Sequence, residues 1–234
     1  MERVHILVTG ASRGIGAAIA ATLDRPSVSL AGHGTRSGIA ADFADPAAPR
    51  SLWSTALDAL DGRIDVLVNN AGVFEAAPLD LDHDEWVAAW DRTQRVNLTA
   101  AAELSRLAVL HWQEHGRGGR LVNVASRAAY RGDSPAHWHY AAAKAGMVAM
   151  TKTIARGYAA EGILAFAVCP GFTMTGMADD YLASRGGDKL LADIPLGRVA
   201  EPAEVAEVVR FLALDAPPSM TGAVLDVNGA SFVR

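Results

Sequence analysis

Tyr140 and Lys144 lie four positions apart in an alanine-rich stretch that has the pattern of a helix. Residues at positions i and i+4 share one face of a helix, so we expect the phenol and the ammonium group to face the same cleft. A nearby cation stabilises a phenolate and lowers the pKa of tyrosine from its usual value of about 10. The pair could therefore move a proton in catalysis, although Tyr-x-x-x-Lys is also a common pair on ordinary helix surfaces.

Two further polar residues follow apolar, strand-like runs: Asn69 comes after 64–68, and Ser126 ends 120–126. Parallel strands end at the same edge of a sheet, so both side chains are expected near the tyrosine. The Ser126 hydroxyl could hold a carbonyl oxygen by hydrogen bonding. It could equally do no more than end its strand, and Ser12 and Ser134 are alternative serines for the same task.

Three glycines, Gly10, Gly14 and Gly16, separate the apolar run that starts at Val4 from a helical pattern. Glycine allows a positive φ and a close approach of a ligand to the backbone. The free N–H groups at the start of the following helix favour a phosphate. The spacing is G-x-x-x-G-x-G, which differs from the G-x-G-x-x-G of many dinucleotide sites. With its flanking strand and helix, this turn predicts a phosphate-binding loop rather than a plain tight turn.

Strand-like and helix-like segments alternate along the whole chain. After the first strand, strands are expected at 26–32, 39–43, 64–68, 120–126, 163–169 and 223–227. Helices are expected from Asp45-Pro46 up to Gly62, and over 84–114, 140–160 and 201–214. Apolar strands without polar alternation are typical of a parallel sheet covered on both faces. We predict an α/β fold: one Rossmann-like domain over 1–234, with a doubly wound parallel sheet of about seven strands in the order 3-2-1-4-5-6-7.

The 234 residues carry a formal charge of −5 and include one cysteine, Cys169. This mild acidity gives no reason to expect nucleic acid or an anionic membrane as a partner. A single cysteine cannot form an intrachain disulfide, which favours a reducing cytoplasm. The start of the chain does not resemble a secretory signal, and no apolar run approaches the ~18 residues of a membrane span. The sequence thus predicts a soluble cytoplasmic protein.

A set of motifs occurs in a fixed order along the chain: Thr9-Gly-Ala-Ser-Arg-Gly-Ile-Gly16, Asn69-Asn-Ala-Gly72, Asn97, Ser126, Tyr140-x-x-x-Lys144 and Pro170-Gly171. Together they resemble the short-chain dehydrogenase/reductase family over essentially the whole chain. The amino-acid sequences of segments 9–16 and 168–175 look most like those of the bacterial 3-oxoacyl-(acyl carrier protein) reductase branch of that family.

The resemblance implies an enzyme that moves a hydride between a nicotinamide cofactor and a carbonyl or alcohol. Tyr140 matches the general acid/base of the family, and Ser126 matches the residue that orients the carbonyl. Lys144 matches the lysine that lowers the tyrosine pKa and holds the ribose of the nicotinamide. Asn97 matches the asparagine that supports a water leading to that lysine, although it could instead be a structural polar group that bends its helix.

The resemblance also implies a set of cofactor-binding residues, and no metal ligands. These residues belong to the glycine turn, the ends of the second and third strands, the Asn-Ala-Gly motif, the catalytic pair and the Pro-Gly segment: Gly10, Ser12, Arg13, Gly14, Ile15, Gly16, Arg36, Asp42, Phe43, Asn69, Ala71, Gly72, Tyr140, Lys144, Pro170, Gly171, Thr173 and Thr175. Asp42, with Phe43 beside it, matches the acidic residue that contacts the adenine ring, but it could also only cap a turn.

The end of the second strand indicates which cofactor is preferred. An NAD site usually has an acidic side chain there, whereas 26–41 contains no Asp or Glu. It contains His33 and Arg36 instead, and the glycine turn adds Arg13. Arginine binds a phosphate through a fork of donors, so NADP(H) is preferred over NAD(H). The connection from the second to the third strand is too short for a full helix.

The substrate is less constrained by the sequence. Residues 131–139 should line the mouth of the pocket, where His137, Trp138 and His139 could select a substrate or only pack. The glycine-broken segment at about 174–198 is expected to be a substrate lid. The expected reaction is reduction of a ketone, such as a 3-oxoacyl thioester carried on acyl carrier protein or coenzyme A. An alcohol, sugar or steroid dehydrogenase and a non-catalytic dinucleotide-sensing protein are the alternatives. The resemblance further implies a homotetramer or homodimer.

Overall fold

The first strand of the chain, β1 (Val4–Val8), lies in the interior of a seven-stranded sheet in the computed structural model, which describes residues 3–174 and 191–234. Neighbouring strands pair in parallel, in the order β3-β2-β1-β4-β5-β6-β7. The other strands are β2 (Val28–Gly34), β3 (Ile39–Ala40), β4 (Val66–Asn69), β5 (Gly119–Val124), β6 (Ile163–Pro170) and β7 (Val224–Val227). The predicted fold class and strand order are confirmed. The strand order reverses between β1 and β4, which is where such sheets bind ligands at their carboxyl ends.

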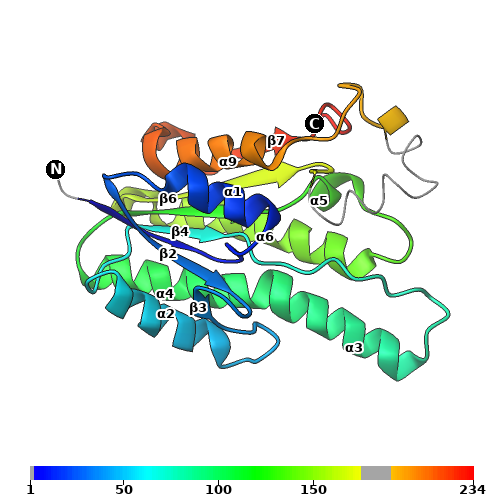
Figure 1. Ribbon diagram of the computed structural model, residues 1–234, viewed down its shortest axis with the longest axis horizontal. Helices are drawn as coiled ribbons and strands as arrows, with labels where there is room; N and C mark the ends of the chain where they lie inside the picture. The colour runs from blue at the N-terminus through cyan, green and yellow to red at the C-terminus, as the bar shows by residue number, and fades with distance from the viewer. Residues whose placement is uncertain (1–2, 175–190) are drawn as a thin grey trace.

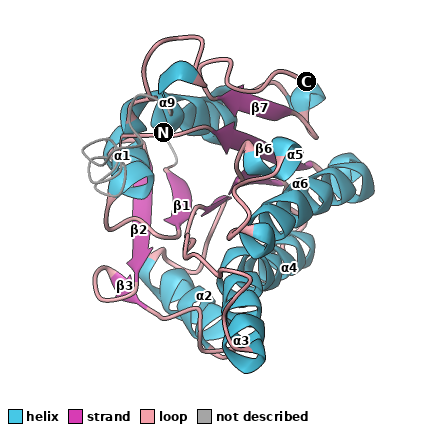
Figure 2. Cartoon of the chain, turned by 90° about the vertical axis from the view of Figure 1, so that its right-hand side faces the viewer, coloured by secondary structure: helices cyan, strands magenta, loops and turns pink. Residues whose placement is uncertain are grey.

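Helices cover both faces of the sheet (Figure 1 and Figure 2). One face carries α1 (Gly14–Leu23) and α9 (Pro202–Arg210), and the other carries α2 (Ala48–Ala59), α4 (Ala100–Glu114) and α6 (Trp138–Tyr158). Parallel strands joined by right-handed crossovers require such layers. The remaining elements are shorter or lie outside the layers: α3 (His83–Gln94), α5 (Ala128–Arg131), the π-helical turns Arg95–Thr99 and Phe211–Asp215, and the 3₁₀ turns Ala159–Glu161 and Pro218–Met220.

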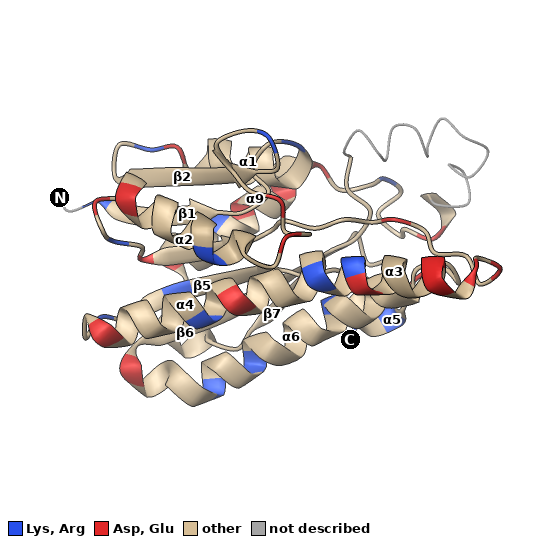
Figure 3. Ribbon diagram, turned by 90° about the horizontal axis from the view of Figure 1, so that it is seen from below, with Lys and Arg blue, Asp and Glu red and all other residues tan. Residues whose placement is uncertain are grey.

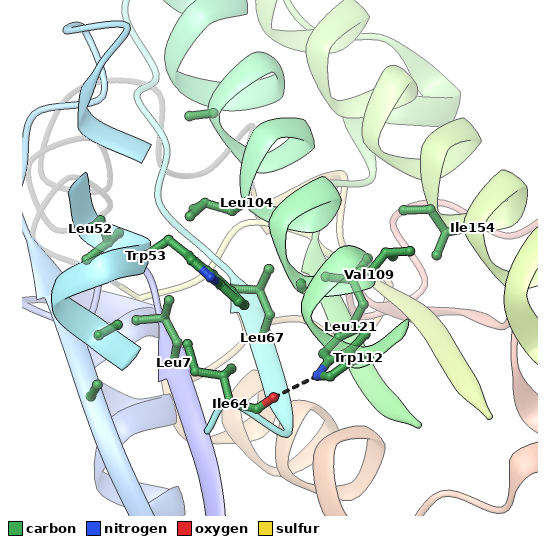
Figure 4. Packing of buried hydrophobic residues seen from close by; sticks show 14 of the residues in the cluster. Leu7, Leu52, Trp53, Ile64, Leu67, Leu104, Val109, Trp112, Leu121 and Ile154 are labelled. Atoms are coloured by element: carbon green, nitrogen blue, oxygen red, sulfur yellow. Dashed lines mark hydrogen bonds between the residues drawn. The ribbon is translucent and has the colours of Figure 1, made fainter. Parts of the chain in front are cut away.

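Side chains of each strand alternate between the two helical layers. In β1, Ile6 and Val8 pack in the cluster with α1 and α9, whereas Leu7 packs in the cluster with α2 and α4. Trp112 of α4 is 2% exposed, and its Nε1–H donates to the Ile64 carbonyl at 2.7 Å (Figure 4). Its ring occupies the place of a side chain at Gly119, where a Cβ would come within 2.1 Å of it. Ring burial and a satisfied N–H together fix α4 against the sheet.

The sheet ends at β3 without the usual crossover helix, as the short connection predicts. Gly38 makes this turn possible, because its φ is +63° and a Cβ there would lie 2.1 Å from the Gly32 carbonyl oxygen. The strand is shorter than the predicted 39–43. Asp42 stops it by forming an Asx turn, in which its Oδ1 accepts from the Ala44 N–H at 3.0 Å.

One predicted helix start is wrong. Asp45-Pro46 does not open α2: Asp45 Oδ1 accepts from the Ala47 N–H at 2.9 Å in a separate turn, and the helix begins at Ala48 with Pro49 in its first turn. The long helix predicted over 84–114 is confirmed as one continuous helical run, in which the π-helical turn Arg95–Thr99 joins α3 to α4. An apolar periodicity cannot reveal such a one-residue bulge, because it displaces the pattern by only one position.

Helix α4 carries both acidic and basic side chains, whereas α6 carries only basic ones (Figure 3). Among the helices in the described part of the chain, none is long and apolar enough to cross a membrane.

Candidate active site

Tyr140 and Lys144 lie on one face of α6, as their spacing predicts, with Lys144 Nζ 5.8 Å from the centre of the Tyr140 ring. Burial raises the pKa of Tyr140 to about 12 and lowers the pKa of Lys144 to about 8. The expected lowering of the tyrosine pKa by the lysine is therefore corrected. Removing both groups from water disfavours both charged forms. Tyr140 keeps its proton at neutral pH, which is the state of a proton donor.

Ser126 follows β5 and hydrogen-bonds the Tyr140 side chain, an interaction that partly offsets the rise in the tyrosine pKa. Its Oγ also accepts from the Ala128 N–H at 3.1 Å, which fixes it at the start of α5. The other two candidate serines lie elsewhere: Ser134 Oγ is 2.7 Å from His137 Nδ1, and Ser12 lies beside Gly34. Of the three, Ser126 is the serine that the fold joins to the tyrosine.

Lys144 is held where three segments meet. It is 4% exposed, and its Nζ donates to the Val124 carbonyl at 2.9 Å. A Cβ on Gly72 would lie 3.6 Å from Lys144 Nζ and 3.2 Å from Asn97 Oδ1, so glycine keeps this space open. Asn97, in the π-helical turn, accepts from the Val73 N–H at 2.7 Å and donates to the Val73 carbonyl at 2.8 Å. Its side chain thus positions the loop after β4 beside the lysine, while the water relay is still a prediction.

The glycine turn is packed too tightly for side chains. Gly10 and Gly14 have φ values of +66° and +54°, and a Cβ on Gly16 would lie 1.9 Å from the Gly10 carbonyl oxygen. Helix α1 follows this turn. Its N-cap residue, Arg13, makes no side-chain cap, and its first turn contains no acidic residue. The first N–H groups of this helix are therefore not capped by a side chain, and the positive end of its dipole fits a phosphate. Ile15 is partly buried in the cluster on this face of the sheet.

The two adjacent asparagines of the Asn-Ala-Gly motif have different tasks. Asn69 is buried, and its Nδ2 donates to Asn123 Oδ1 at 2.9 Å inside the sheet. Asn70 Nδ2 donates to the carbonyls of Thr9 and Gly10 at 3.1 and 3.0 Å. The Asn69 Nδ2 is thus used in the interior, whereas its buried Oδ1 has no partner among the described residues, and a contact of Asn69 with the cofactor is still a prediction. Sequence reasoning missed Asn70, although it stood next to the selected residue.

The Thr9 hydroxyl completes the link between the glycine turn and β4, because it accepts from the N–H groups of Asn70 and Ala71 at 3.0 and 3.1 Å. Ala71 in turn lies against the turn, since a Cβ on Gly10 would come within 2.7 Å of its Cα. Thr9 was also missed, and its place directly before Gly10 was the available signal.

Arg13 and Arg36 are exposed where the glycine turn meets the loop between β2 and β3. The two loops are close, since a Cβ on Gly34 would lie 3.0 Å from the Ser12 Cβ. Within the described ranges, neither arginine has an ion pair or a side-chain hydrogen bond. Both guanidinium groups are thus free for an anionic ligand, as the NADP(H) prediction requires.

His33 and Phe43 are buried against the glycine turn. His33 is 3% exposed, its Nδ1 accepts from the Gly10 N–H at 3.2 Å, and its Nε2 lies 2.9 Å from the Ala41 carbonyl. Phe43 is buried and stacks on this imidazole, with the ring centres 4.5 Å apart. Both rings support the glycine turn, and a contact of Phe43 with the cofactor is still a prediction. Asp42 beside them is exposed and caps a turn, so its contact with an adenine ring is still a prediction.

The Pro-Gly segment lies at the carboxyl end of β6. Gly171 has no room for a side chain, because a Cβ there would lie 2.8 Å from the Asn228 Cβ. Thr173 is buried, and its hydroxyl donates to the Gly171 carbonyl at 3.3 Å. Pro170 accepts the Arg127 N–H at 2.9 Å, which ties this segment to the residue after Ser126. Thr175 and most of the expected lid at 174–198 lie outside the described residues.

Comparisons with known proteins agree with this arrangement. A family model described as enoyl-(acyl carrier protein) reductase matches residues 10–230. The 3-oxoacyl-(acyl-carrier-protein) reductase of Vibrio cholerae is 35% identical over 248 residues, which cover 100% of this chain and 99% of the relative. The enzyme of the same name from Thermotoga maritima is 40% identical over 172 residues, 74% of this chain and 68% of the relative.

A solved structure from Agrobacterium tumefaciens, provisionally described as a 2-deoxy-D-gluconate 3-dehydrogenase with bound NADP, superposes with a TM-score of 0.88. It is 30% identical and covers 100% of this chain and 98% of its own. The Agrobacterium protein bears the name of a different substrate from the two reductases, and its structure matches this fold over the whole chain. The chain therefore belongs to the short-chain dehydrogenase/reductase family of NAD(P)-dependent oxidoreductases.

Proposed function

We propose that this protein is an NADP(H)-dependent reductase that converts a ketone to a secondary alcohol. The observation that carries the proposal is the meeting of Ser126, Tyr140 and Lys144 at the carboxyl end of the sheet. A hydroxyl that hydrogen-bonds a protonated phenol, with an ammonium 5.8 Å from its ring, is suited to give a proton to an oxygen that gains negative charge.

The residues present fit a nicotinamide dinucleotide. The side-chain-uncapped start of α1 and the glycine turn would hold its phosphates, and Lys144 would hold its ribose near Tyr140. When bound, NADPH supplies a hydride to the carbonyl carbon. Ser126 holds the carbonyl oxygen by a hydrogen bond, and the Tyr140 hydroxyl donates its proton to this oxygen as the C=O π bond becomes a lone pair. The Lys144 ammonium stabilises the phenolate that is left, until a proton from solvent restores it.

The preference for NADP(H) over NAD(H) rests on Arg13 and Arg36. Two exposed guanidinium groups without partners among the described residues would pair with a ribose 2′-phosphate. The end of β2 offers no carboxylate that would favour the ribose hydroxyls of NAD. The bound NADP of the Agrobacterium structure supports the same choice.

We further propose a 3-oxoacyl thioester as the substrate, carried on acyl carrier protein or coenzyme A, because the curated relatives bear that name over the full length of the chain. A sugar acid oxidised at a hydroxyl with NADP is the second candidate, because the Agrobacterium protein is described as a 2-deoxy-D-gluconate 3-dehydrogenase with bound NADP. The proposal includes a cytoplasmic location, a homotetrameric or homodimeric assembly and a single domain over 1–234 with a lid at about 174–198.

Purified protein tests the proposal directly. NADPH oxidation is followed at 340 nm with an acetoacetyl thioester, and the reverse reaction is followed with simple alcohols or sugar acids and NAD or NADP. We expect fast oxidation of NADPH by the thioester and little reaction with alcohols and NAD. Turnover of a sugar acid with no reaction of the thioester would favour the second candidate.

A further inference from the structure

An aromatic stack lies beside the catalytic tyrosine. Phe74, in the loop after β4, stacks flat on His137, with ring centres 3.9 Å apart and ring planes within 4°. The same Phe74 ring meets Tyr140 edge to face, with the centres 4.8 Å apart and the planes at 80°. Phe74 is 40% exposed and His137 is partly buried, so the stack is open on one side. His137 therefore lies one ring away from the phenol that donates the proton.

The position of His137 is fixed by several bonds. Its ring Nδ1 lies 2.7 Å from Ser134 Oγ, and its backbone N–H donates to the Ser134 carbonyl at 2.9 Å. A backbone bond of 2.8 Å from the Ala77 N–H to the Ala136 carbonyl joins the two loops that carry the stack. Within residues 3–174 and 191–234, no hydrogen bond to His137 Nε2 is found. The imidazole is thus rigidly oriented with one nitrogen left over for a ligand.

The two neighbours of His137 do not share this property. Trp138 is 53% exposed and packs edge to face on Trp86, with the ring centres 6.4 Å apart. His139 is 2% exposed, and its Nδ1 accepts from the Tyr140 N–H at 3.0 Å. Among these three residues, His137 alone combines contact with the Phe74 stack and a free, partly accessible nitrogen.

We propose that His137 is a substrate-positioning residue, which hydrogen-bonds through Nε2 to a second oxygen of the substrate placed β to the ketone that is reduced. This inference rests on the proposed ketone reduction and deepens it by selecting β-dicarbonyl substrates over simple ketones. Burial lowers the pKa of His137, so the imidazole is neutral and acts as a hydrogen-bonding group rather than as a charge. The exposed part of the Phe74 ring would pack against the carbon chain between the two oxygens.

The test compares two ketones of similar chain length: an acetoacetyl thioester, which has the second oxygen, and 2-pentanone, which lacks it. For His137→Ala we expect kcat/KM for the thioester to fall about tenfold, mainly through KM, as for the loss of one hydrogen bond. The value for 2-pentanone should change less than about twofold. His137→Gln can place an amide N–H near the position of Nε2 and should recover most of the loss. Ser134→Ala, which only releases the ring, should give a smaller loss of the same kind.

His115→Ala is the matched control, because this exposed histidine lies at the other end of the molecule, after α4. Equal losses on both ketones in His137→Ala, or no loss on either, would overturn the inference while leaving the ketone reductase intact. A wild-type enzyme that reduces 2-pentanone as well as the thioester would also overturn it. If the wild-type enzyme binds NADPH but reduces neither ketone, the proposed function itself fails, and this inference fails with it.

Discussion

The catalytic end and the adenosine end of the candidate site are built in opposite ways. At the catalytic end, Lys144 is 4% exposed and bonded to the Val124 carbonyl, and Asn97 is fully buried on Val73. At the adenosine end, Arg13 and Arg36 are exposed and have no partners within the described part of the chain. Proton transfer needs pKa values set by burial, whereas phosphate binding needs donors that are free until the ligand arrives. Buried, hydrogen-bonded side chains therefore form the catalytic part of the candidate site, and exposed side chains form the part that would bind the anion.

Substitution at the ordered end should have the largest effect. Tyr140→Phe removes the proton donor and keeps the ring that packs on Phe74. We expect kcat to fall about 10²- to 10⁴-fold with little change in NADPH affinity, measured by steady-state kinetics and by quenching of protein fluorescence. A variant that kept the wild-type rate would show that another group supplies the proton.

Substitution at the free end should change cofactor choice and leave the chemistry intact. For the double variant Arg13→Ala and Arg36→Ala we expect the Kd for NADPH to rise about 10- to 100-fold, because two charge-assisted contacts to a phosphate are lost. The Kd for NADH and kcat at saturating cofactor should change less than about threefold. Equal losses of affinity for NADPH and NADH would show that these two arginines do not bind the 2′-phosphate. Arg25→Ala, at an exposed arginine away from the glycine turn, serves as the control.

The buried lysine should also give the reaction a pH limit. Burial lowers the pKa of Lys144 to about 8, so its ammonium is present below that pH and is lost above it. We therefore expect kcat for ketone reduction to fall by up to about tenfold per pH unit above pH 8, while the pKa of Tyr140 at about 12 keeps the phenol protonated. A flat profile from pH 7 to 10 would mean that the charge of Lys144 is not needed.

The same lysine should also affect stability, with the opposite sign, because stability should rise with pH where activity falls. The unfolded chain holds the lysine proton up to about pH 10.5, whereas the folded protein releases it near pH 8. The unfolded state thus binds more protons between these values, and this group makes the free energy of unfolding rise as the pH rises through that window. Lys144→Met should raise the free energy of unfolding at pH 7, by up to about 3 kcal/mol, and should abolish this slope.

Urea denaturation at pH 7 and pH 9.5 measures both quantities for Lys144→Met. The lost bond to the Val124 carbonyl works against the gain, and catalysis should be lost in the same variant. If Lys144→Met were less stable than the wild type at both pH values, the ammonium would stabilise the fold, contrary to the expected cost of burying its charge.

Much of the fold could be read from the sequence, because the elements that set it have strong local patterns. Continuous apolar strands and the glycine turn predicted the strand order and the place of the site. The sequence analysis was wrong or incomplete where a polar side chain could bond to either of two nearby partners. Asp45 caps a turn instead of a helix, and Asn69 bonds inside the sheet while Asn70 holds the glycine turn. The type of a residue does not say which of two nearby partners it meets.

The sequence by itself determined the family, the parallel sheet and the Tyr140–Lys144 pair, since helical periodicity alone places two residues four apart on one face. Only the tertiary structure decided that burial, rather than the neighbouring ammonium, sets the pKa of Tyr140. It also turned His33 inward and left His137 Nε2, beside Phe74, without a hydrogen-bond partner among the described residues. Burial and orientation depend on what the distant parts of the chain pack against a side chain, and local sequence does not contain that information.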